Sequence, residues 1–236
     1  MSYLPYISDN DLESAVQTVV NCIFQVQARP ADSLYKNVID PFSAIFDGVV
    51  NGISFDDWLL REKVRQEQKT VQNAIGEFHQ KIIGSIPGWQ NLGRSQLIDV
   101  CNPSQKIIAE IKNKFNTVKG SERISIYDNL LYALQTTTYQ DFTAYYVEII
   151  PKKDRNNLIY NQPFTPSDNK TKTSRAPNQK ILVIKGQDFY DLASGVPGAL
   201  SMLFDVLPEA ISKIAGVNQF TQAEKERFRT LFDRAY

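Results

Sequence analysis

The sequence lacks the residues on which several kinds of site depend. Its 236 residues include one histidine, His79, and two cysteines, Cys22 and Cys101. A single histidine excludes a Ser-His-Asp triad and any metal site with several histidine ligands. Two cysteines are too few for a disulfide scaffold or a cysteine-based zinc site. No run approaches the roughly 20 apolar residues of a membrane span, and the N-terminus has no signal-peptide pattern. We therefore expect a cytoplasmic protein without a membrane partner.

The sequence also has no net charge, because its 26 basic residues balance its 26 acidic ones. The two signs are nevertheless separated along the chain. Residues 1–62 carry nine acidic and three basic side chains, whereas residues 151–180 carry seven basic and two acidic ones. A neutral total gives no global field to attract nucleic acid, but the late basic segment is a local candidate for such a contact.

The apolar pattern predicts an α/β (α+β) fold. Helical spacing over the first 90 residues predicts helices that begin near Ser8, Asp40 and Ser54. The next part predicts a central mixed sheet of about five strands, including residues 96–101, 106–112, 143–151 and 179–185. A further helix is expected over 122–135, and the end is helical again, with Thr221 and Glu224 as a capping box. The apolar segment 199–214 is either core or dimer interface.

The most informative segment is the expected hairpin over residues 97–112. If its turn centres between Ser104 and Gln105, then Asp99 lies directly opposite Glu110. Side chains alternate along a strand, so Glu110 and Lys112 share one face. The pattern therefore predicts two carboxylates and one ammonium group within a few ångströms of each other.

Such a cluster is costly to bury without a partner, and a hard divalent cation supplies one. Mg²⁺ binds oxygen ligands, often one or two carboxylates together with substrate phosphate. Lys112 would orient a water molecule or stabilise the transition state. This combination indicates hydrolysis of a phosphodiester, although an ordinary strand pair with one salt bridge would show the same Glu-x-Lys spacing.

Asp99 followed by Glu110-Ile111-Lys112 resembles the PD-(D/E)xK nuclease motif, with Ile98 in place of the proline. The continuation 109–117 is similar to type II restriction endonucleases of this superfamily, most of all those that cut GGNCC. Segments 76–80 and 184–190 fit the same group. The resemblance implies a restriction-endonuclease-like fold over a single domain, 1–236, with a mainly helical part at 1–90 and the catalytic sheet at 91–195.

The resemblance also implies an activity and its partners. A Mg²⁺-dependent homodimer in a prokaryotic cytoplasm would cut double-stranded DNA at a short palindromic site and leave 5′-phosphate ends. A cognate DNA methyltransferase would protect the host site. Asp99, Glu110 and Ile111 would be the metal ligands, Lys112 would join Asp99 and Glu110 in catalysis, and Glu77 is the candidate fourth acidic residue.

Candidate DNA-binding residues fall into two segments. Those directly after the catalytic strand could touch the scissile backbone, and those in the basic segment could reach guanine or phosphate. They are Asn113, Lys114 and Asn116, followed by Lys152, Lys153, Arg155, Lys170, Lys172 and Arg175. A solvated loop is the alternative interpretation of the second group.

Two other functions stay open from the sequence. A repair nuclease could use the same catalytic residues and recognise DNA structure, and a DNA-binding module could keep the fold without cutting. The intact set of Asp99, Glu110 and Lys112 speaks against the second of these.

Overall fold

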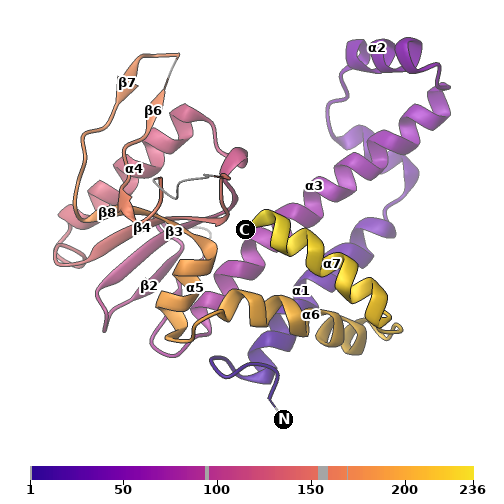
Figure 1. Cartoon of the computed structure of the whole chain (residues 1–236). Coiled ribbons are helices and arrows are strands. Elements are labelled where there is room, and N and C mark those ends of the chain that lie inside the picture. The colour runs from indigo at the N-terminus through magenta and orange to yellow at the C-terminus, as the bar shows by residue number, and fades with distance from the viewer. Residues whose placement is uncertain (1, 94–95, 154–158, 169) are drawn as a thin grey trace.

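A computed structural model describes residues 2–93, 96–153, 159–168 and 170–236. Figure 1 shows a mixed sheet with helices on both faces and a long helix that carries a helical arm away from the sheet. The predicted fold class is thereby confirmed. Within the described part, none of the helices is long and apolar enough to cross a membrane.

The N-terminal part is helical because its apolar residues repeat at helical spacing and each helix has a polar cap. α1 (Asp9–Gln27) begins after Ser8, whose hydroxyl accepts from the backbone of Asp11. A short 3₁₀ helix, η1 (Ala31–Lys36), leads to α2 (Pro41–Asn51), which Asp40 caps. α3 (Phe55–Gly84) begins after Ser54 and runs for 30 residues to the edge of the sheet. All three expected helix starts are confirmed.

The sheet has six strands in the order β1-β2-β3-β4-β8-β5. The strands are β1 (Gln90–Asn91), β2 (Val100–Asn102), β3 (Ile107–Lys114), β4 (Thr143–Ile150), β5 (Gln162–Pro163) and β8 (Ile181–Lys185). The central strands β3, β4 and β8 are parallel, whereas β1, β2 and β5 pair antiparallel at the edges. β6 (Ser167–Asp168) and β7 (Thr173–Ser174) form a separate hairpin.

Both faces of the central strands are covered, and alternation along each strand divides the core in two. On one face Ala109 and Val147 pack with α1, α3, α5 (Gly186–Ser194) and α6 (Ala199–Ala215). On the other face Ile108 and Tyr146 pack with α4 (Gly120–Gln135). The short 3₁₀ helix η2 (Phe115–Thr117) connects β3 to α4.

The C-terminal helices complete the first of these cores. Leu200 and Leu203 of α6 are buried, so these two side chains of the apolar segment 199–214 belong to the core. α7 (Gln222–Ala235) follows, and Thr221 with Glu224 forms the expected capping box. Phe232 of α7 packs against Phe204 of α6 with ring centroids 4.8 Å apart.

The main differences from the sequence prediction are at strand boundaries. The first hairpin strand was expected over 96–101 but is confined to Val100–Asn102. Asp99 precedes it and still donates its backbone N–H to the carbonyl of Ala109. The sheet gains β5 from a segment with no expected strand, because Asn161 and Phe164 donate to the carbonyls of Val183 and Ile181.

Gly186 begins α5 where this helix crosses the end of β4. We expect this position not to tolerate a side chain. A Cβ atom there would lie 2.4 Å from the carbonyl oxygen of Ile149, a backbone atom that cannot move alone. We expect Gly186→Ala to lower the free energy of unfolding by about 2 kcal/mol or more, measured by urea denaturation.

Gly76 provides the matched control, because it lies inside α3 and a methyl group added to it would have no neighbouring atom within 4 Å. Gly76→Ala should raise the free energy of unfolding by about 0.5–1 kcal/mol through helix propensity. Equal stability of the two variants would contradict the close approach of α5 to β4.

Candidate active site

The hairpin of β2 and β3 places Asp99 opposite Glu110. Val100 pairs with Ala109 and Cys101 with Ile108, so the turn centres between Ser104 and Gln105 as predicted. The turn is closed by Asn102, whose side-chain oxygen accepts from the backbone of Gln105 at 3.0 Å. The predicted register is confirmed, and it brings the two carboxylate-bearing residues to the same position of neighbouring strands.

The contacts at this position join three elements. The Oδ2 atom of Asp99 accepts from the backbone N–H of Ile111 at 2.7 Å. Lys112 Nζ lies 2.9 Å from Glu110 Oε1, and their side chains are 28% and 16% exposed. The side chain of Gln80, on α3, also hydrogen-bonds to Asp99. The predicted residues Asp99, Glu110 and Lys112 therefore form one half-buried cluster, and Gln80 joins it.

The electrostatics of the cluster show a shortage of positive charge. Burial, together with the neighbouring Glu110 carboxylate, raises the pKa of Asp99 to about 7, although the Ile111 amide, Lys112 and Gln80 oppose the shift. Burial acts to lower the pKa of Lys112, but the Glu110 and Asp99 carboxylates outweigh it and the pKa is raised. Lys112 thus remains a cation, and Asp99 is the group that most needs a further positive charge.

The donor set fits a hard cation with few protein ligands. Within the described residues, no group of three or more His, Cys, Asp or Glu side chains is arranged to hold a metal. Two carboxylates beside one ammonium group match the manner in which Mg²⁺ binds when substrate and water complete its shell. The buried side chain of Ile111 has no ligating atom, so only the backbone carbonyl of this residue could contribute to such a site.

A buried ionic network flanks the cluster on β4. Glu148 is paired across the parallel register with Lys112, and only 2% of the residue is exposed. Arg123 of α4 contacts Glu148 at 2.7 Å and lies over the rings of Tyr146 and Phe164. Tyr160 donates its hydroxyl to Glu148 at 2.6 Å. The sequence reasoning missed this network, although a glutamate inside the apolar run 143–150 was a usable signal.

Glu77, the one residue of α3 that was expected at the site, lies on another side of this helix. Glu77 lines a cleft between α1 and α3 with Asn21, Cys22 and Asn73. Gln80, one turn later, is the α3 residue that bonds to Asp99. A catalytic role for Glu77 therefore stays a prediction.

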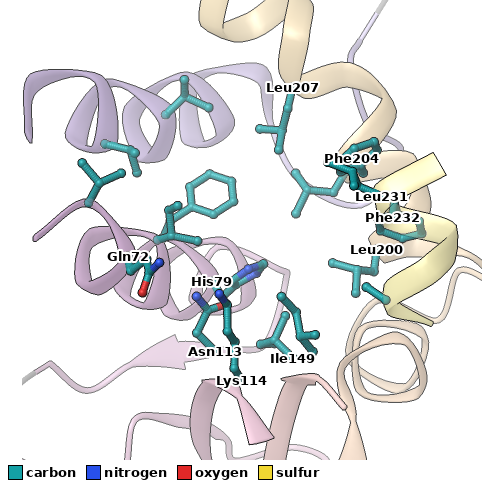
Figure 2. A pocket seen from close by; sticks show the side chains of 18 of the residues that line it. Gln72, His79, Asn113, Lys114, Ile149, Leu200, Phe204, Leu207, Leu231 and Phe232 are labelled. Carbon is teal, nitrogen blue, oxygen red and sulfur yellow. The ribbon is translucent and has the colours of Figure 1, made fainter. Parts of the chain in front are cut away.

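The residues that follow Lys112 lie beside an apolar cavity. Asn113 and Lys114 line this cavity of about 600 Å³ between α1, α3, α6 and α7, and Figure 2 shows them next to His79. His79 Nδ1 is 2.8 Å from the hydroxyl of Tyr190, and burial lowers its pKa to about 4. Asn116 is exposed in η2.

The basic segment contains both exposed lysines and a paired arginine. Lys152 and Lys153 are exposed after β4, and Lys170 and Lys172 are exposed at the tip of the β6–β7 hairpin. Arg175 instead makes a bidentate pair with Asp128 of α4, at 2.6 and 2.7 Å. Arg155 lies outside the described residues.

Comparisons with known proteins identify the family of this chain. The family model described as "Eco47II restriction endonuclease" matches residues 4–216. The type II restriction enzyme Eco47II of Escherichia coli is 39% identical over 242 residues, with 100% of both chains covered. The type II restriction enzyme Sau96I of Staphylococcus aureus is 32% identical over 211 residues, which cover 89% of this chain and 80% of that enzyme. The predicted type II restriction endonuclease is confirmed, and the chain belongs to the Eco47II restriction endonuclease family.

Proposed function

We propose that this restriction endonuclease is a Mg²⁺-dependent homodimer that hydrolyses both strands of double-stranded DNA at a short palindromic, GGNCC-like site. The observation that carries the proposal is the cluster of Asp99, Glu110 and Lys112 across one hairpin. The similarity to Eco47II and Sau96I supports the restriction activity, and the resemblance to enzymes that cut GGNCC supports the target. A two-fold dimer suits a palindromic site because equal half-sites call for equal subunits.

Asp99, Glu110 and the Ile111 carbonyl would hold the cation. When bound, Mg²⁺ would neutralise charge on the scissile phosphate and make an attacking water more acidic. The chain itself fixes the ligands, since the Ile111 amide and Gln80 hold the Asp99 carboxylate while Lys112 holds that of Glu110. Lys112, a cation at neutral pH, stabilises the negative charge that develops on the phosphate oxygens. The products would carry 5′-phosphate ends.

The exposed lysines provide the surface for the DNA backbone. Lys170 and Lys172 project at the tip of the β6–β7 hairpin, and Lys172 adopts a left-handed backbone with φ of 58°. The Arg175–Asp128 pair ties this hairpin to α4, which gives Arg175 a positioning role in the free protein. Lys152, Lys153 and Arg155 would add further charge, and Asn113, Lys114 and Asn116 would contact DNA near the scissile bond.

The biological setting follows from the relatives. Both are bacterial restriction enzymes, so we place this enzyme in a prokaryotic cytoplasm with a cognate DNA methyltransferase that protects the host site. The methyltransferase need not bind the endonuclease.

Removal of the ammonium group tests the catalytic assignment. Lys112→Ala should reduce Mg²⁺-dependent cleavage of plasmid DNA by about 10²–10³-fold or more, because the transition state loses its fixed positive charge. Discrete bands from the parent enzyme, with ends mapped by sequencing, would define the site. The control is Lys225→Ala in the first turn of α7, at the end of that helix that does not line the cavity beside Asn113 and Lys114, and this variant should cut like the parent. Discrete bands of undiminished yield from Lys112→Ala would refute the assignment.

Charge removal at the hairpin tip tests the DNA surface. Lys170→Ala combined with Lys172→Ala should weaken DNA binding about tenfold in 100 mM salt, measured by fluorescence anisotropy with Ca²⁺ in place of Mg²⁺. Each lost phosphate contact releases one counterion fewer, so the slope of log K against log salt should fall by roughly 2. Lys225→Ala again serves as the control. An unchanged slope in the double variant would remove the hairpin from the interface.

A further inference from the structure

Helix α2 presents its large apolar side chains to solvent. Phe42, Ile45, Phe46, Val49 and Val50 recur at i, i+3, i+4, i+7 and i+8, and their exposed fractions are between 65% and 78%. None of the residues of α2 is buried. In a monomeric protein such a stripe normally faces the core, so its outward orientation is the reverse of the usual arrangement.

The side of α2 that faces its own chain consists of Ala44, Asp47 and Gly48, which are only partly exposed. Ala44 and Gly48 are less exposed than the stripe, and Gly48 approaches the turn at Ile53. Next to the helix, Val38, Phe55 and Leu60 are also 62–102% exposed. We define residues 38–60 as the arm, and Figure 1 shows α2 at the end of α3 that lies farthest from the sheet.

The exposed apolar area of the arm is large enough for a stable protein interface. Large apolar side chains carry about 150–200 Å² each, so the eight exposed residues present roughly 900 Å². The largest apolar patch on a typical monomer is about 300–600 Å². A stable interface buries about 800 Å² of each partner, which is the order of the apolar area that the arm exposes.

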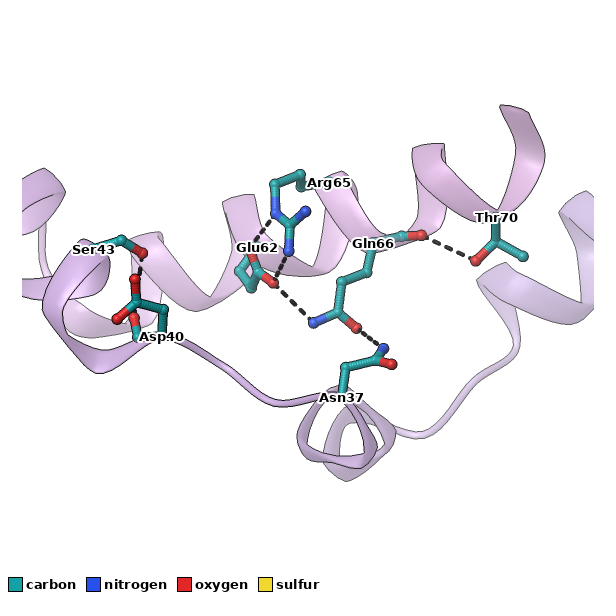
Figure 3. A network of polar contacts seen from close by, with 7 residues as sticks. All are labelled: Asn37, Asp40, Ser43, Glu62, Arg65, Gln66 and Thr70. Carbon is teal, nitrogen blue, oxygen red and sulfur yellow. Dashed lines mark hydrogen bonds and ion pairs between the residues drawn. The ribbon is translucent and has the colours of Figure 1, made fainter. Parts of the chain in front are cut away.

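Polar contacts at the base hold the arm in place. Asn37 donates its side-chain amide to Gln66 at 2.6 Å, and Gln66 donates to Glu62 at 2.9 Å. Glu62 also accepts two hydrogen bonds from the Arg65 guanidinium (Figure 3). The Glu62 residue is only 8% exposed. Asp40 caps α2 through the backbone of Phe42 at 2.9 Å. The apolar face is therefore presented by a preorganised support, which lowers the entropic cost of docking.

We propose that a second copy of this chain covers the apolar face of the arm, so that two arms form the dimer contact about one two-fold axis. This inference rests on the proposed function, because a palindromic site cut on both strands requires two active sites. The centre of the face is free of charge, as in the cores of stable interfaces. Residues 38–60 carry four aspartates and no lysine or arginine, so the arm repels anionic lipid surfaces and DNA and favours a protein partner.

The test is the oligomeric state of the purified full chain. Sedimentation velocity should give the parent a mass of twice 26.8 kDa at micromolar concentration. Phe46→Glu and Val49→Glu place a charge in the contact and should raise the dimer dissociation constant at least about 100-fold. Both side chains are more than 70% exposed, so the folded monomer should keep its circular dichroism and melting temperature.

Val217→Glu is the matched control, because Val217 is 56% exposed but lies after α6, outside the arm. This variant should remain dimeric like the parent. A parent that sediments as a monomer, with or without DNA, or arm variants that stay dimeric, would overturn the inference. Cleavage is scored separately, so a dimeric parent that never cuts DNA would refute the proposed function and leave the arm contact standing.

Discussion

The opposition of Asp99 and Glu110 across one hairpin is the constraint on which the site depends. The β2–β3 register sets it, and that register follows from the turn closed by Asn102. A shift of one residue between β2 and β3 would place Asp99 and Glu110 on opposite faces of the sheet, because β3 is also held in register by β4. The two carboxylates are largely shielded from solvent and have one ammonium group between them. The metal-free protein therefore has too little positive charge at this point.

This lack of positive charge beside Asp99 and Glu110 affects the stability of the protein. The pKa of Asp99 is raised to about 7, whereas an unfolded aspartate titrates near 3.9. Between those two values the folded chain binds more protons than the unfolded chain, so the stability of the metal-free protein falls as the pH rises. A cation held by Asp99 and Glu110 would remove the cost. Activity and stability are thus linked through the same two side chains.

The sequence was sufficient to predict those features that depend on local pattern. Helix starts at Ser8, Asp40 and Ser54 followed from capping residues, and the hairpin register followed from the turn at residues 102–105. Contacts between distant segments were not predictable, because no spacing rule joins them. Gln80 reaches Asp99 only because α3 packs against the sheet edge. Likewise, Asp128 forms an ion pair with Arg175 only because the β6–β7 hairpin packs against α4.

The most direct test of the central claim is a ¹³C NMR titration of the aspartate and glutamate carboxyl groups in the metal-free protein. One carboxyl resonance, absent from Asp99→Asn, should titrate near pH 7 and shift to a lower pKa when Mg²⁺ is added. Such a result would show that Asp99 lacks a positive partner until the cation binds. Titration of every carboxyl group below pH 5 without metal, or no response of the Asp99 resonance to Mg²⁺, would contradict the account.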